Sequence, residues 1–123
     1  MRLFKNAWFE RFARKQNISD KALCEAIERA EKGLIDADLG GGVIKLRISR
    51  HGQGKSGGFR TIVLYKAAEK AFFVYGFAKN DRANIRPDEE STFRKAAPYL
   101  MSLTDEQISQ LIRNGQFTEV SDE

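Results

Sequence analysis

The chain has 123 residues, of which 41% are hydrophobic and 31% charged, so it holds enough apolar material for one packed domain. This composition excludes a disordered segment and multidomain machinery, and we expect a single domain over residues 1–123. The 21 basic residues against 17 acidic ones give a formal net charge of +4, a mild excess that would mean little if it were spread evenly.

The first part of the chain predicts one short strand and two helices. Residues 2–5 contain two large apolar side chains and suit a strand. Asn6 can cap a helix over residues 8–15, whose aromatic side chains share one face. Ser19 or Asp20 can cap a second helix, which carries apolar residues at spacings of three and four and ends at the next glycine.

The middle of the chain predicts strands. Residues 34–39 are compatible with an extended segment, and residues 43–49 alternate, with Ile, Leu and Ile on one face and Lys, Arg and Ser on the other. A loop with four glycines in residues 51–58 leads to a β-branched and aromatic run over residues 59–65, which indicates a hairpin. Residues 71–78 form the most apolar run and are expected to be a central strand.

The last part of the chain predicts two helices and an acidic tail. Pro87 suits the first turn of a helix that continues to about residue 100. Thr104 resembles the start of a capping box for a final short helix, and residues 119–123 form the tail, which is expected to be either idle and solvated or repelling toward a polyanion. The fold class is therefore α+β: a small antiparallel sheet packed by N-terminal and C-terminal helices, which we expect on one side of the sheet. The core would span about residues 1–100, and residues 104–123 would be an extension.

One stretch of the chain has an unusual charge. The thirty residues between Asp38 and Glu69 contain no carboxylate. The basic residues of this stretch are Lys45, Arg47, Arg50, Lys55, Arg60 and Lys66. A concentrated positive charge of this kind indicates a polyanion as a partner.

Several other classes of protein are disfavoured. The segment Gly54-Lys55-Ser56 resembles a Walker loop, but the glycine that should precede it is missing and a strand follows instead of a helix. A hydrolytic metal site needs several His, Cys or carboxylate ligands, while this chain has one histidine, His51, and one cysteine, Cys24. We therefore expect no metal, no cofactor and no intrachain disulfide.

The sequence contains no targeting or membrane signal that we can recognise. Its first residues turn charged without an apolar signal region, and no apolar run reaches eighteen residues. We expect a cytoplasmic protein with no membrane partner.

Four basic side chains are predicted to gather at the strands. Lys45 and Arg47 share one face of their strand, and an antiparallel partner would bring Arg60 close to them. Lys79 follows the apolar strand and would project at the same end of the sheet. A group of cations can hold a phosphodiester and stabilise the charge that develops when it breaks.

The segments Ile44-Lys45-Leu46-Arg47, residues 54–65 (GKSGGFRTIVLY) and residues 73–80 (FVYGFAKN) resemble the RelE-type toxins of bacterial toxin–antitoxin pairs. The likeness covers about residues 34–95 and is greatest for the HigB-like branch. It rests on the Gly-Gly-aromatic-Arg junction and the Ala-Lys-Asn strand end, which occur together at the expected separation. One departure is that well-studied RelE toxins have a tyrosine shortly after this last strand, where this chain has Ile85 and Arg86.

The resemblance implies a RelE-like α+β toxin that enters the ribosome and cuts mRNA without metal, using the ribose 2′-hydroxyl as nucleophile. Lys45 and Arg47 would line the substrate and share proton transfer, Arg60 would bind the scissile phosphate, and Lys79 would stabilise the leaving oxygen. The RNA-binding residues would be Arg50, His51 and Lys55. The implied partners are the ribosome, mRNA and a cognate antitoxin of the helix-turn-helix type.

Two other functions fit the same fold or the same charges. The ParE branch shares the fold and inhibits DNA gyrase, although it generally lacks so full a set of basic residues. A non-catalytic RNA- or ribosome-binding module would use the same cations only to bind phosphates.

Overall fold

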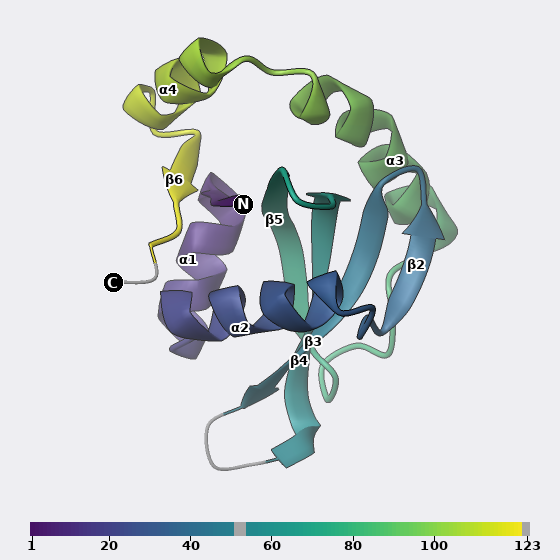
Figure 1. Cartoon of the computed structure of the whole chain (residues 1–123). Helices are drawn as coiled ribbons and strands as arrows, with labels where there is room; N and C mark the ends of the chain where they lie inside the picture. Colours follow the sequence, from purple (N-terminus) through teal and green to yellow (C-terminus); the bar gives the residue numbers. More distant parts are fainter. Residues whose placement is uncertain (51–53, 122–123) are drawn as a thin grey trace.

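The computed structural model describes residues 1–50 and 54–121, and for Arg50 and residues 54–57 it describes the backbone alone. Within the described residues the elements follow the order β1 (Arg2–Asn6), α1 (Ala7–Gln16), α2 (Asp20–Glu31), β2 (Ala37–Gly40), β3 (Val43–Arg50), β4 (Gly54–Lys66), β5 (Lys70–Ala78), α3 (Pro87–Met101), α4 (Asp105–Arg113) and β6 (Phe117–Glu119). Figure 1 shows this arrangement.

The strands form one mostly antiparallel sheet. Their order is β2-β3-β4-β5-β1-β6, with β1 parallel to β5 and the other neighbours antiparallel. The apolar strand β5 lies inside the sheet, between β4 and β1, as its sequence predicts. The α+β fold class is thus confirmed.

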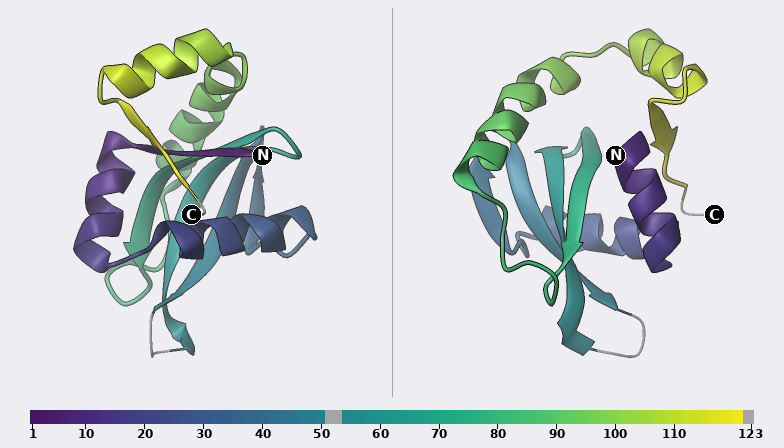
Figure 2. Two further views of the ribbon diagram at one scale, coloured as in Figure 1. Left: turned by 60° about the vertical axis from the view of Figure 1, so that its left-hand side comes forward. Right: turned by 180° about the vertical axis from the view of Figure 1, so that it is seen from behind.

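Helices cover both faces of the sheet, so the expectation of helices on one side is wrong. Helices α1 and α2 pack on one apolar cluster, and α3 with the segment that follows it packs on the other. Figure 2 shows the two helix pairs on different sides of the strands. The reason lies in β5, where the consecutive residues 71–74 are all buried: Ala71 and Phe73 belong to the first cluster, Phe72 and Val74 to the second.

Three helix starts follow from local capping chemistry. The Oδ1 atom of Asn6 accepts a hydrogen bond from the Phe9 amide at 2.7 Å, and the Ser19 hydroxyl accepts one from Ala22 at 3.1 Å. The hydroxyl of Thr104 accepts one from Gln107, which completes the predicted capping box. Among the described residues, no helix is long and apolar enough to span a membrane.

The end of the chain is part of the fold, which the sequence did not indicate. β6 pairs with β1, and the Val120 amide donates a hydrogen bond to the Leu3 carbonyl at 2.8 Å. Glu119 forms an ion pair with Arg2 at 2.9 Å. The first residues of the expected acidic tail are therefore neither idle nor fully solvated.

Candidate functional site

Three of the predicted basic residues lie on adjacent positions of β3 and β4. The register pairs Arg47 with Arg60 and Lys45 with Ile62. Because side chains alternate along a strand, Lys45 and Arg47 point away from Ile44, Leu46 and Ile48, which pack under α1 and α2. The basic side chains therefore share the face of the sheet that α3 covers further along.

The three side chains converge on one carboxylate, that of Asp36. The Lys45 Nζ and the Arg60 Nε lie 3.6 Å and 3.4 Å from its Oδ2, and an Arg47 guanidinium nitrogen lies 3.4 Å from its Oδ1. The Asp36 side chain is 20% exposed and the Arg60 side chain only 7%. We call Lys45, Arg47 and Arg60 the cation cluster, and its geometry defines a position for an anion.

Arg60 is the most buried member of the cation cluster. Its Nη1 atom is inaccessible to solvent and has no hydrogen-bond acceptor among the described residues. A buried donor without an acceptor is costly, more so when it carries charge. An oxyanion that displaced the Asp36 side chain could supply an acceptor to the Arg60 guanidinium.

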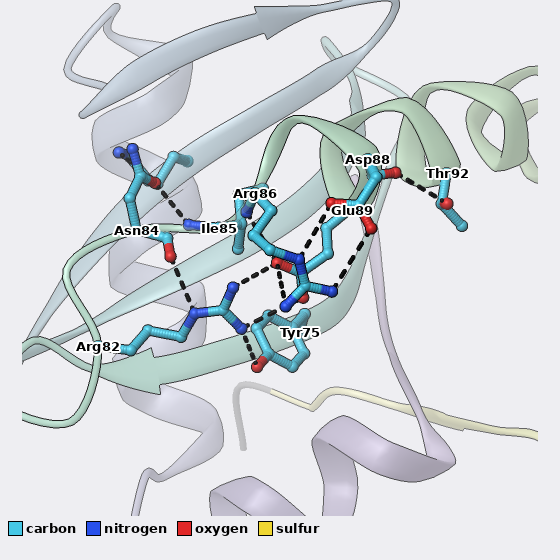
Figure 3. Close-up of polar contacts among 9 residues, drawn as sticks. Tyr75, Arg82, Asn84, Ile85, Arg86, Asp88, Glu89 and Thr92 are labelled. Carbon is cyan, nitrogen blue, oxygen red and sulfur yellow. Dashed lines mark hydrogen bonds and ion pairs between the residues drawn. The ribbon is translucent and has the colours of Figure 1, made fainter.

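A second polar network adjoins the cation cluster and is drawn in Figure 3. The Lys45 Nζ donates to the Asn84 Oδ1 at 3.3 Å, and the Arg82 Nε donates to the Asn84 carbonyl at 2.9 Å. The guanidinium of Arg82 also donates to the Tyr75 hydroxyl at 2.9 Å and forms an ion pair with Glu89. These bonds hold the segment between β5 and α3 against the sheet face that carries Lys45.

The Arg82–Glu89 ion pair joins the segment between β5 and α3 to the first turn of α3. The hydrogen bond to Glu89 raises the pKa of Arg82, and the hydrogen bond from Arg82 lowers the pKa of Glu89. Both groups therefore stay charged at neutral pH. Ile85, in the same segment, is buried in the core and is 6% exposed.

Of the other predicted site residues, only Lys79 has a described side chain. Lys79 follows β5 and is exposed; its amide faces the Gly58 carbonyl at 3.4 Å, and its side chain forms no ion pair with a described residue. Arg50 ends β3 and Lys55 lies in β4, and only their backbones are described. His51 lies outside the described residues.

The sequence did not single out Asp36, Arg82 or Asn84. Asp36 stands on a bend directly before β2, three positions before the acid-free stretch begins, and the fold brings it back beside that stretch. Its proximity to the acid-free stretch is the one signal that could have drawn attention to it. Asn84 and Arg82 lie between elements, where no periodicity predicts a contact.

A cleft adjoins the cation cluster between α2 and β3. Its lining includes Arg29, Leu34, Ile35, Asp36, Leu46 and Arg47. Among the described residues, no three His, Cys, Asp or Glu side chains are grouped so that they could hold a metal ion.

These observations define a small α+β protein with three basic side chains gathered around one carboxylate on a face of its sheet. The family model described as "RelE toxin of RelE / RelB toxin-antitoxin system" matches residues 1–120. The chain therefore belongs to the RelE toxin family, and membership implies a cognate antitoxin as its partner. No curated protein gives a significant match to the chain.

Proposed function

We propose that this toxin is a ribosome-dependent, metal-independent endoribonuclease that cuts mRNA and so inhibits translation. The observation that carries the proposal is the convergence of Lys45, Arg47 and Arg60 on a single anion position. Family membership and the likeness to the HigB-like branch add support. The toxin would act in the cytoplasm, where ribosomes and mRNA are found.

In the proposed reaction the ribose 2′-oxygen attacks the neighbouring phosphorus and the 5′-oxygen leaves. The products are a 2′,3′-cyclic phosphate and a new 5′-hydroxyl end. Negative charge builds up on the phosphate oxygens during the attack, and preorganised cations stabilise it most where water is excluded. Arg60 would hold the scissile phosphate, because it is the cluster's most buried cation, while Lys45 and Arg47 would line the RNA and share proton transfer.

The remaining basic residues have auxiliary roles in this proposal. Lys79 would stabilise charge on the leaving 5′-oxygen. Arg50, His51 and Lys55 would contact the RNA backbone. The ends of β3 and β4 that carry Arg50 and Lys55 project past the other strands (Figure 1).

The proposed partners are the ribosome, its bound mRNA and a small helix-turn-helix antitoxin. The antitoxin would neutralise the toxin by covering the cation cluster or by blocking its entry into the ribosome. Free toxin would show little activity on naked RNA, because the ribosome helps to hold the message.

The test is Arg60→Ala, with brief expression in cells and mapping of transcript ends. We expect the wild-type toxin to stop growth and to produce new 5′-hydroxyl ends. The variant should lose cleavage by about 10²-fold or more, the usual effect of removing one charge-stabilising donor. The matched control is Arg113→Ala, which removes an exposed arginine of α4 and should leave cleavage unchanged.

Other outcomes of this experiment would contradict the proposal. Full toxicity of Arg60→Ala at equal soluble levels would remove the cation cluster from the mechanism. DNA damage and altered supercoiling with intact transcripts would indicate the ParE-like action on gyrase. Salt-sensitive ribosome binding without new ends would indicate a non-catalytic module.

A further inference from the structure

Asp36 holds the cation cluster together with contacts that are long for hydrogen bonds. Its three ion pairs measure 3.4–3.6 Å, whereas charge-assisted hydrogen bonds are normally about 2.7–2.9 Å. By contrast, Lys5 meets its carboxylate partners Glu10 and Asp20 at 2.7 Å and 2.9 Å. The Asp36 carboxylate therefore balances charge in the cluster, and among the described residues it accepts one long hydrogen bond, from Arg47 at 3.4 Å.

The charge balance around Asp36 is also incomplete. Three cations face one carboxylate, which leaves the group with an excess of positive charge. The buried Nη1 of Arg60 has no acceptor among the described residues. A phosphate at the same position would bring negative charge and oxygens in a tetrahedral arrangement, which suits arginine better than one carboxylate shared by three cations.

Asp36 is placed so that its side chain can leave the cluster while the backbone stays. The residue lies on a bend before β2, and its amide donates to the Lys45 carbonyl at 2.9 Å, which fixes the main chain. Among the residues whose side chains are described, the three long ion pairs alone hold the Asp36 side chain, and Asp36 borders the cleft between α2 and β3.

We propose that Asp36 is an internal counter-ion that positions Lys45, Arg47 and Arg60 in the free toxin and competes with RNA phosphate for them. This inference rests on the proposed function, whose anion site it refines. The carboxylate keeps three like charges in place before substrate arrives and lowers the affinity of the site for a single phosphodiester. Binding of RNA then requires further contacts, such as those that the ribosome provides.

The binding test uses two probes that cannot be cleaved: inorganic phosphate and a short 2′-O-methyl RNA. Asp36→Asn should bind both probes roughly tenfold more tightly than the wild type, because one competing charge has been removed at close range. The matched control is Asp38→Asn, two residues further on. Asp38 is exposed and accepts a hydrogen bond from the Gly40 amide at 2.9 Å, a bond that an asparagine oxygen can keep. The control should bind both probes like the wild type.

The effect of phosphate on the melting temperature adds a readout that the loss of a purely structural ion pair would not change. Without phosphate, Asp36→Asn should melt at a lower temperature than wild type, because the three cations repel one another. Added phosphate should raise its melting temperature by more than it raises that of wild type or of Asp38→Asn. Asp36→Ala should behave in the same way, which guards against an effect of the new amide.

Unchanged or weaker binding of both probes by the Asp36 variants would overturn the inference. So would a variant that fails to fold at every phosphate concentration, because Asp36 would then be a structural ion pair only. These outcomes are separate from the fate of the proposed function. Tighter phosphate binding in a toxin that produces no RNA ends would support the counter-ion and refute the nuclease, whereas RNA ends without tighter binding would do the reverse.

Discussion

The buried cations Lys5 and Arg60 differ in the number and distance of their carboxylate partners. The Lys5 side chain, 8% exposed, lies between the Glu10 and Asp20 carboxylates at short distances. Burial alone would lower the pKa of Lys5, but its contacts with the two carboxylates raise it by more. Arg60 is as buried, yet it has one long ion pair and an unsatisfied donor. Lys5 thus has two carboxylates at short range, while Arg60 shares one carboxylate with two other cations, as the proposed anion site requires.

Lys5→Met should destabilise the protein by about 2–4 kcal/mol, because it leaves two carboxylates at the junction of β1, α1 and α2 without their shared cation. The measurement is urea unfolding at neutral pH. Lys66→Met is the matched control. Lys66 and Glu69 form an exposed pair, with side chains 51% and 52% exposed, so its loss should cost less than about 0.5 kcal/mol. Equal costs for the two variants would contradict the assignment of Lys5 as a buried structural cation.

At this scale the sequence predicts one part of the site and misses another. Strand alternation puts Lys45 and Arg47 on one face, and hairpin pairing places Arg60 opposite Arg47, since both rules are local. Asp36 and Asn84 reach the cation cluster from a bend and from the segment between β5 and α3. Their contacts depend on how whole elements pack, which no pattern of neighbouring residues encodes.

At the scale of elements, α1 packs against β5 at a point where the Phe12 ring lies close to Gly76. The Phe9 and Phe73 rings pack with centroids 5.2 Å apart, and the Phe12 ring lies over Gly76. A Cβ atom built on Gly76 would come within 2.6 Å of the Phe12 ring. That ring is confined, because Phe9, Trp8 and Phe59 surround it at centroid distances of 5.2–5.7 Å.

Gly76→Ala should therefore destabilise the fold by about 1–3 kcal/mol through overpacking. The control is a double-mutant cycle with Phe12→Leu, measured by chemical denaturation. Leucine leaves more room above position 76, so the same glycine substitution should cost less in that background. Equal costs in both backgrounds would mean that the Phe12 ring does not confine this position.

The elements also show why some of the fold was predictable. The helix starts at Asn6, Ser19 and Thr104 follow from hydrogen bonds within three residues, which a sequence displays directly. The strand β6 has three residues and exists because it pairs with β1 at the other end of the chain. Its formation depends on a contact more than 110 residues away in sequence, since Asn6 pairs with Phe117. The helices on both faces are a different case, because the continuous apolar run of β5 could have indicated a sheet that is covered on both sides.

For the molecule as a whole, charged contacts connect the beginning of the chain to its end. Arg2 forms ion pairs with Glu119 in β6 and with Asp105 in α4, at 2.9 Å and 3.1 Å. Asp20 in α2 accepts a hydrogen bond from the Ser121 amide at 3.2 Å. The stability of the assembled sheet therefore depends on carboxylates that remain ionised, in a protein that already carries a net positive charge.

Acid should weaken these contacts in a definite pH range. Hydrogen bonds from Lys5 and Arg2 hold the pKa values of Glu10 and Glu119 below the ordinary value of 4.5. As the pH falls below about 4.5, the unfolded chain takes up protons before the folded one does, so these groups lose their stabilising contribution progressively until the folded pKa values are passed. Urea unfolding at a series of pH values should show stability that is level near neutrality and declines below about pH 5.

Glu119→Gln should cost less than about 1 kcal/mol at pH 7, because the side chain is 41% exposed, and should show a smaller decline in acid. Glu106→Gln, which removes an exposed carboxylate from α4, should decline like the wild type. If Glu119→Gln loses as much stability in acid as the wild type, its ion pair with Arg2 does not contribute to holding the chain ends together.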